Sequence, residues 1–226
     1  MRNQLSALLI ATLMAASLCL PAQAVELPAP TPRPPEWAQP IDTHYNLYQM
    51  TPTLYRSRQP DSAAQPLLKK LGVLTVVDFI NESDSKWLSD PAVTQVQIPL
   101  RSAHVDDADI IKSLRAIQTA ERNGPVLIHC KHGLDRTGLV AAMYRIVVQG
   151  WTKQAALDEM QRGGFGDIEH LKYGTAYINN VDVDAVRTAL NSGACSTQLL
   201  ASCTIKGWFL EKTSAVMNEQ SILWRL

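Results

Sequence analysis

The stretch VLIHCKHGLDRTGL, residues 126–139, determines most of what the sequence predicts. It opens with a short apolar run that is typical of a buried strand, and Cys130 follows this run directly. A loop containing Gly133 comes next, and a helical pattern begins at Arg136 and Thr137. A strand, a tight loop and a helix in this order direct backbone N–H groups and the positive end of the helix dipole at one point. We therefore expect an anion-binding loop with Cys130 at its base.

Cys130 and Arg136 have complementary chemistry toward a phosphate group. The field that attracts an anion also favours a thiolate over a thiol, and the thiolate is the nucleophilic form of cysteine. The planar guanidinium of Arg136 can hold two phosphate oxygens in a bidentate contact. In-line attack by Cys130 on phosphorus would form a cysteinyl-phosphate that water then hydrolyses. We expect neither a metal nor another cofactor, and the sequence contains no ligand spacing such as CxxC or HExxH.

Strand and helix patterns alternate along the chain. Apolar or alternating runs predict strands at residues 53–56, 73–80, 93–98 and 126–129. Periodic patterns predict helices at residues 62–71, 107–122, 137–149 and 152–161, and one or two more within residues 168–191. This alternation predicts the α/β class, with a mainly parallel central sheet flanked by helices.

The segment HCKHGLDRTG, residues 129–138, resembles the His-Cys-x5-Arg-Ser/Thr signature of the protein tyrosine phosphatase superfamily. The segments YRS and LGVLTVVDF upstream, and the helix RTGLVAAMYR, are similar to its small dual-specificity branch. The resemblance runs from about Asn46 to about Cys203. It implies the cysteine-phosphatase fold and a phosphatase activity that needs no cofactor.

The resemblance also implies roles for individual residues. Cys130 would be the nucleophile and Arg136 the phosphate clamp. Thr137 would hydrogen-bond the sulfur and assist its departure, and His129 would brace the loop from behind. Phosphate would bind to the main-chain amides of Lys131, His132, Gly133, Leu134, Asp135 and Arg136. The side chains of Lys131 and His132 either add positive potential for anionic substrates or are simply solvated loop residues.

The general acid, which protonates the leaving group, is expected in the loop PLRSAHVDDADII, residues 99–111. The resemblance places this acid slightly earlier than the loop's aspartates, where the chain has Ala103 and His104. Asp106 lies nearest that position, ahead of Asp107, and is the predicted acid. Both aspartates are equally suited to capping the helix predicted at residues 107–122.

The N-terminus has the pattern of a cleaved signal peptide. Arg2 supplies a positive charge, residues 5–20 are apolar, and Ala22-Gln23-Ala24 provides a small-x-small cleavage site. The apolar run is short for a membrane span. We therefore expect residues 1–24 to be removed, and the mature protein to be periplasmic without stable membrane insertion.

Three parts are predicted for the mature chain. Residues 25–45 are proline-rich and are predicted to form an extended linker, residues 46–190 a phosphatase domain, and residues 191–226 a C-terminal extension. Cys195 and Cys203 are spaced for a small disulfide loop, with two buried free thiols as the alternative. Cys130 would remain as the unpaired cysteine.

Composition and motif together lead to three hypotheses of function. Lys+Arg and Asp+Glu both number 21, so the chain has no basic excess that would indicate a nucleic-acid-binding protein. The leading hypothesis is an exported protein tyrosine or dual-specificity phosphatase acting on a phosphotyrosine-containing protein. The resemblance adds a membrane signalling protein as partner and a role in biofilm signalling. A basic loop would also suit phosphoinositides or inositol phosphates, and Ala103 would suit a phosphate-binding pseudophosphatase.

Overall fold

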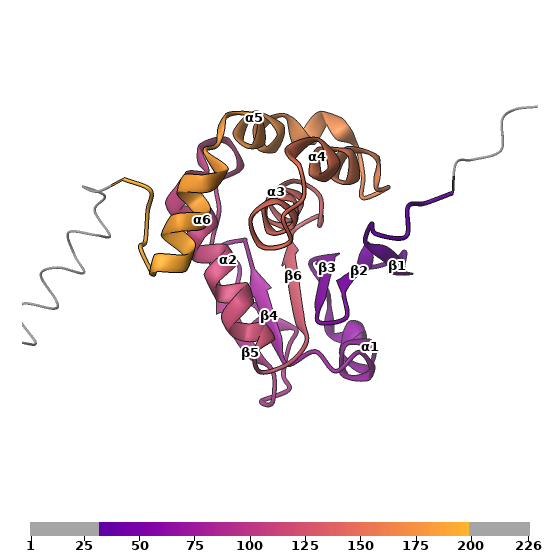
Figure 1. Cartoon of the computed structure of the whole chain (residues 1–226). Helices are drawn as coiled ribbons and strands as arrows, with labels where there is room; N and C mark the ends of the chain where they lie inside the picture. The colour runs from indigo at the N-terminus through magenta and orange to yellow at the C-terminus, as the bar shows by residue number, and fades with distance from the viewer. Residues whose placement is uncertain (1–31, 199–226) are drawn as a thin grey trace, which may run out of the picture. The chain divides into compact units, whose positions relative to one another are not determined.

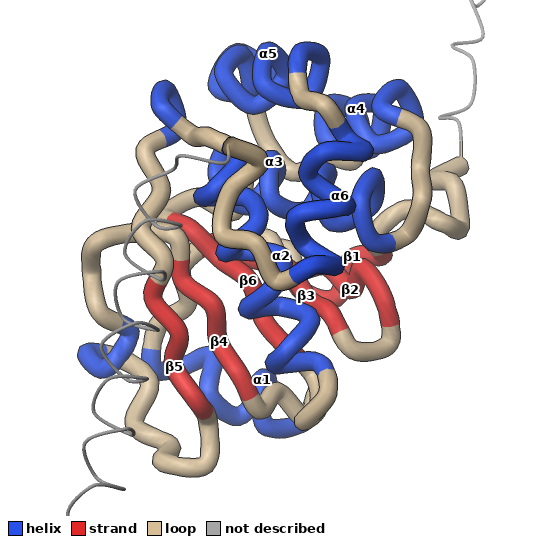
Figure 2. The backbone as a smooth tube through the Cα atoms, turned by 60° about the vertical axis from the view of Figure 1, so that its left-hand side comes forward, coloured by secondary structure: helices blue, strands red, loops and turns tan. Residues whose placement is uncertain are grey.

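A computed structural model describes residues 32–198, whose centre is a six-stranded mixed sheet (Figure 1). Its strands are β1 (Gln39–Asp42), β2 (Leu47–Thr51), β3 (Leu54–Arg58), β4 (Thr75–Asp78), β5 (Thr94–Gln97) and β6 (Val126–Cys130). They lie in the order β1-β2-β3-β6-β4-β5. The four strands β3, β6, β4 and β5 run parallel, side by side in Figure 2, while β1, β2 and β3 pair antiparallel. The predicted α/β class with a mainly parallel sheet is confirmed.

Helices cover both faces of the sheet. They are α1 (Gln65–Lys70), α2 (Asp107–Glu121), α3 (Asp135–Met143), α4 (Lys153–Arg162), α5 (Lys172–Asn180) and α6 (Val183–Ser192). Helices α2 and α3 pack directly on the strands, α4 and α5 pack on α3, and α6 packs on α2 (Figure 1). The α3 helix continues into a π-helical turn at Tyr144–Val148. In residues 32–198, no helix combines the length and the hydropathy needed to span a membrane.

Side-chain alternation along β6 separates two hydrophobic clusters. Val126 and Ile128 belong to the larger cluster, which includes residues of α2 and α3, whereas Leu127 belongs to the smaller cluster with Leu68 of α1. Cys130 also belongs to the larger cluster, whereas the His129 ring packs against Trp87 of the smaller cluster. Because successive strand side chains point to opposite faces, Cys130 and His129 lie on opposite sides of the sheet.

The sheet begins earlier in the chain than the proline-rich composition predicts. Strand β1 lies within residues 25–45, which were predicted to be a linker, and Pro40 is tolerated there because β1 is an edge strand. Ala38 is fully buried, and its N–H donates to Glu159. The Arg33 guanidinium donates to the carbonyl oxygens of Ala38 and Gly163, both at 2.7 Å. Residues 33–45 are therefore anchored to the folded domain.

Several predicted features lie outside the described residues. These are the signal peptide at 1–24, the first part of the proline-rich segment, Cys203 with its predicted disulfide to Cys195, and the chain from residue 199 onward. Within the described residues, Cys130 is a free and buried cysteine. The described start of the C-terminal extension contacts α2, because Arg115 donates to the carbonyl oxygen of Ala194 at 2.8 Å.

A buried ion pair joins the helical layer to the first strands. Arg145 donates through Nε and Nη2 to the two carboxylate oxygens of Glu159, each at 2.8 Å. Arg145 Nη1 also donates to the carbonyl oxygen of Met50 at 3.2 Å, and its guanidinium lies 4.3 Å from the ring centroid of Trp151. Both members of the pair are almost fully buried.

Replacing Arg145 by Met is expected to lower the free energy of unfolding by about 3–5 kcal/mol, because it leaves the Glu159 carboxylate buried without its partner. Urea unfolding measures this loss. The matched control is Arg162→Met, which removes the exposed ion pair with Asp158 and should cost less than about 1 kcal/mol. Equal losses in the two variants would contradict a structural role for the buried pair.

Candidate active site

Residues 130–136 run from the end of β6 to the start of α3, and their loop is called the phosphate loop below. Several of its carbonyl groups are hydrogen-bonded to residues outside the loop. Four successive carbonyl oxygens each accept a hydrogen bond: Lys131 from Gln59 N at 3.3 Å, His132 from Asn46 Nδ2 at 3.2 Å, Gly133 from Arg56 Nη2 at 2.8 Å, and Leu134 from Gly138 N at 2.8 Å. In a trans peptide the C=O and the following N–H point in opposite directions. The N–H groups of residues 132–135 therefore point into the loop. This is the arrangement that binds anions in backbone nests.

Gly133 is required for this loop conformation. Its φ is +72°, in the left-handed region that favours glycine. A Cβ at this position would lie 2.5 Å from both the backbone nitrogen of Arg58 and the carbonyl carbon of Ser57. The loop thus packs directly against the end of β3, and only a residue without a side chain fits there.

A cavity of about 340 Å³ is lined by this loop and by one residue from elsewhere in the chain. The lining residues are Cys130, His132, Leu134, Asp135, Arg136 and His170. Cys130, predicted as the nucleophile, is 2% exposed. His170 belongs to a short 3-10 turn, Ile168–Leu171, and no sequence pattern predicted a role for it. Four of the six predicted phosphate-binding residues thus line the cavity with Cys130, whereas Lys131 and Gly133 do not.

Two buried side-chain donors of residues 130–137 have no hydrogen-bond partner among residues 32–198. They are Arg136 Nε and Thr137 Oγ1. Arg136 Nη1 makes one long contact, 3.4 Å, with the carbonyl oxygen of Phe79. Buried donors without partners are rare in folded proteins, and here they favour an anionic ligand. The Thr137 hydroxyl is one of these two donors, so its predicted hydrogen bond to the Cys130 sulfur is not formed in this structure.

Arg56 holds the loop in place by donating to the Gly133 carbonyl oxygen, a role that no sequence pattern indicated. It is 2% exposed, and its Cζ lies 3.6 Å from the ring centroid of Phe165. Burial lowers the pKa of the Arg56 guanidinium to about 10, while the negative charges of Glu159 and Cys130 raise it. The side chain therefore stays charged at neutral pH. Arg56 therefore places a buried positive charge beside the loop, where it is bonded to the Gly133 carbonyl oxygen.

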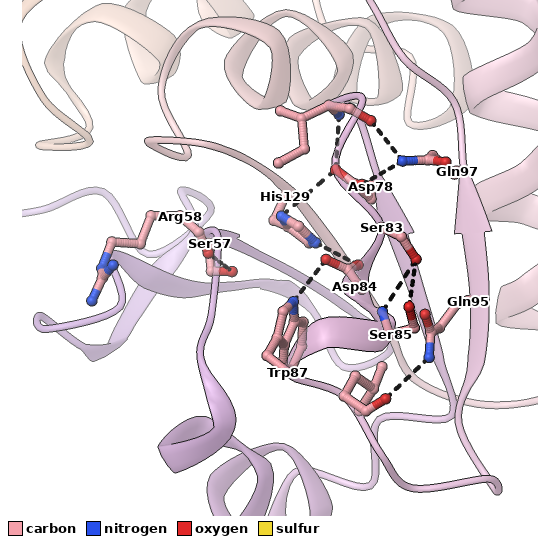
Figure 3. A network of polar contacts seen from close by, with 12 residues as sticks. Ser57, Arg58, Asp78, Ser83, Asp84, Ser85, Trp87, Gln95, Gln97 and His129 are labelled. Carbon is pink, nitrogen blue, oxygen red and sulfur yellow. Dashed lines mark hydrogen bonds and ion pairs between the residues drawn. The ribbon is translucent and has the colours of Figure 1, made fainter.

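His129 lies between two buried carboxylates on the other side of the loop (Figure 3). Its Nε2 is 2.9 Å from Asp84 Oδ2, and its Nδ1 is 3.9 Å from Asp78 Oδ1. Asp84 also accepts from the Trp87 indole N–H at 2.8 Å. Burial raises the pKa of Asp78 to about 6, against the lowering effect of the hydrogen bond from Ile80 N–H. This network fits the bracing role expected for His129, which does not line the cavity.

The aspartates at the start of α2 are engaged in structural hydrogen bonds. Asp106 accepts from Asp109 N at 2.9 Å, and Asp109 accepts from Asp106 N at 3.4 Å, which together form a capping box. Asp107 accepts from the hydroxyl groups of Tyr177 at 2.7 Å and Thr197 at 2.6 Å. None of the three lines the cavity. The geometry favours the capping role over the general-acid role that was predicted for Asp106.

No group of three or more His, Cys, Asp or Glu side chains in residues 32–198 is arranged to hold a metal ion. The groups that the described site offers are the cysteine, the arginine, the inward N–H groups, two imidazoles and the carboxylate of Asp135. A buried cysteine at the end of a parallel strand, with an arginine at the start of the next helix, defines the class of cysteine-dependent phosphatases.

Comparison with known proteins agrees with this class. The family model of the Swiss Army Knife protein, DSP-PTPase phosphatase domain (PTP-SAK), matches residues 52–172. The chain therefore belongs to this family and is a phosphatase of the dual-specificity type, as the resemblance implied.

Individual relatives align with most of the chain. This chain is 51% identical to the dual specificity protein phosphatase TpbA of Pseudomonas aeruginosa strain UCBPP-PA14 over 204 residues. The aligned region covers 90% of this chain and 93% of TpbA. A crystal structure of P. aeruginosa TpbA in complex with pTyr has a TM-score of 0.70 and 52% identity, over 72% of this chain and all of that one. A solution structure of "tyrosine phosphatase related to biofilm formation A (TpbA)" from P. aeruginosa has a TM-score of 0.52 and 52% identity. The match covers 80% of this chain and 93% of that one.

Gly133→Ala is expected to weaken binding of vanadate, a phosphate mimic, at least about tenfold. The left-handed backbone alone costs an L-residue roughly 1–2 kcal/mol, and 1.4 kcal/mol corresponds to a tenfold change in affinity. Isothermal titration of vanadate into the protein measures this. Gly150→Ala is the matched control, because Gly150 has φ +75° but no atom within 4 Å of the added Cβ. An unchanged affinity in Gly133→Ala would contradict the packing described for the loop.

Asp106→Asn separates the two roles considered for Asp106. Asparagine caps a helix as well as aspartate does but cannot donate a carboxylic proton, so stability and aryl-phosphate turnover should both be retained. Asp106→Ala should lose about 1 kcal/mol of stability through the lost cap, with turnover again retained. Thermal unfolding and steady-state kinetics provide the readouts. A fall in turnover of the 10²–10⁴-fold size typical of a lost general acid in Asp106→Asn would restore the catalytic role.

Proposed function

We propose that this chain is an exported protein tyrosine or dual-specificity phosphatase that acts through a cysteinyl-phosphate intermediate. The observation that carries this proposal is the arrangement around Cys130. Four peptide N–H groups point inward, the half-buried Arg136 has a buried donor, Nε, without a partner among residues 32–198, and the thiol lies at the base of the cavity. Each of these groups stabilises an anion, and together they match a phosphoryl group with its three peripheral oxygens.

The reaction follows from these positions. The inward N–H groups and Arg136 bind the phosphoryl oxygens and hold phosphorus in front of the sulfur. The Cys130 thiolate attacks, an S–P bond forms, and the P–O bond to the leaving group breaks. Water then attacks the cysteinyl-phosphate, the S–P bond breaks, and inorganic phosphate leaves. Because the donors are already oriented, they stabilise the charge of the transition state without reorganising.

The substrate is proposed to be a phosphotyrosine-containing protein. Support comes from TpbA, a relative with 52% identity whose crystal structure holds pTyr. We further propose that the substrate is a membrane signalling protein met in the periplasm, and that the pathway concerns biofilm formation. The export pattern in residues 1–24 and the biofilm-related name of the relative support this part.

A multiply phosphorylated small molecule, such as an inositol phosphate, is the second candidate. The observation in its favour is the presence of His132 and His170 beside Arg136 in the cavity wall, with Lys131 exposed next to them. Several basic groups around one cavity suit a ligand with more than one phosphate.

The test starts from the full chain expressed in a Gram-negative host. The protein should be recovered from the periplasmic fraction, and mass spectrometry should find its N-terminus at Val25. Kept reduced and in the presence of a chelator, it should hydrolyse a phosphotyrosine peptide faster than a phosphoserine peptide or inositol hexakisphosphate. Vanadate should inhibit the reaction, and Cys130→Ser should abolish it.

Other outcomes have defined meanings. Preference for the inositol phosphate would replace the protein substrate by the second candidate. Vanadate binding without turnover of any substrate would contradict the catalytic proposal and identify a phosphate-binding pseudophosphatase. A protein retained with residues 1–24 in the cytoplasm would contradict the proposed export.

A further inference from the structure

The reaction needs a proton donor that the start of α2 does not provide. When phosphorus is attacked in line, the leaving oxygen lies on the side opposite the sulfur. A donor must therefore stand away from the base of the cavity, on a wall that the leaving group passes. The carboxylates of Asp106 and Asp107 are committed to other hydrogen bonds and do not line the cavity.

His170 is the one lining residue among those described that does not belong to residues 130–136. Side chains of residues 130–136 surround the phosphate position itself, whereas His170 enters the cavity from a separate segment. Imidazole is the side chain whose ordinary pKa, about 6.5, lies closest to neutral pH, so it can both give and take a proton there. His170 is exposed, which lets its ring meet a bound substrate.

The segment that carries His170 is fixed to the phosphate loop. The Asn46 side-chain amide donates to two carbonyl oxygens, that of His132 at 3.2 Å and that of Phe165 at 2.8 Å, and so bridges the two segments. Gly166 packs so closely on Leu134 that a Cβ on it would lie 3.0 Å from the leucine side chain. The position of His170 relative to Cys130 is therefore set by direct contacts between the two segments.

The start of the 3-10 turn is fixed as well. Asp167 caps it by accepting from Glu169 N at 3.0 Å, and Leu171 at its end is 2% exposed. The turn thus has a capped beginning and a buried end, with His170 immediately before the buried residue. The cap and the buried leucine thus fix the backbone of His170 beside the cavity that its side chain lines.

We propose that His170 is the proton donor and acceptor of the phosphatase reaction, a role that rests on the proposed function. In the first step the S–P bond forms, the P–O bond breaks, and the leaving oxygen takes a proton from the His170 imidazolium. In the second step the neutral imidazole accepts a proton from the attacking water, the S–P bond breaks, and the Cys130 thiolate is restored. Phosphate leaves, and His170 is an imidazolium again.

The test compares substrates with different leaving groups. In His170→Ala, turnover of phenyl phosphate should fall about 10²–10⁴-fold, since phenolate must be protonated as it leaves. Turnover of dinitrophenyl phosphate should change far less, because dinitrophenolate leaves without a proton. Added imidazole should restore phenyl phosphate turnover by entering the space of the removed side chain. His170 is exposed, so the variant should fold normally, and circular dichroism checks this.

His44→Ala is the matched control. His44 is an exposed histidine that does not line the cavity, so its removal should leave both substrates unaffected. Equal losses on both substrates in His170→Ala, or no loss on either, would overturn the proposal. Retained turnover of dinitrophenyl phosphate by the variant shows that the cysteine chemistry stands even if the role of His170 fails.

Discussion

The hydrogen bonds that hold the carbonyl groups of residues 131–134 outward are the interaction on which the rest of the site depends. A peptide chain offers as many acceptors as donors, so a concave loop binds an anion only if its oxygens are turned away. Three of the four donors that do this come from residues 46–59, and one of them is the buried Arg56. The segment that forms β2 and β3 thus has a chemical consequence. Strand β3 carries Arg56, and the residues just before β2 and just after β3, Asn46 and Gln59, carry the other two donors.

Much of the fold and the centre of the site could be predicted from sequence. Apolar β-branched runs predicted the buried strands β4 and β6, and the alternating run at residues 93–98 predicted the more exposed strand β5. Asp106 was predicted as an N-cap and is one. The spacing of Cys130 and Arg136 predicted that they share one cavity, and both line it, because the two residues belong to one short continuous segment.

The rest could not be predicted, because it depends on contacts between distant segments. Strand β1 was not predicted because a proline-rich stretch has the composition of a linker. An edge strand nevertheless tolerates proline, since its outer N–H groups need no partner strand. Arg56 sits at an inward position of β3, but only the structure shows that its partner is the Gly133 carbonyl. His170 is separated from Cys130 by two helices, so no spacing relates them. For Asp106, nearness in sequence suggested a catalytic role, and the capping box gives the residue a structural one.

The long-range contacts of Asn46 have a further consequence for how the protein acquires activity. This side chain joins carbonyl groups 86 and 119 residues away, and Arg33 reaches Gly163 across 130 residues. Contacts of such sequence separation form only after large loops have closed, and chains rich in them fold slowly. The catalytic loop is continuous in sequence, yet its oxygens stay unoriented until both ends of the domain have docked. We therefore expect the isolated signature segment to bind anions weakly, and a newly made chain to become reactive only after these long-range contacts have formed.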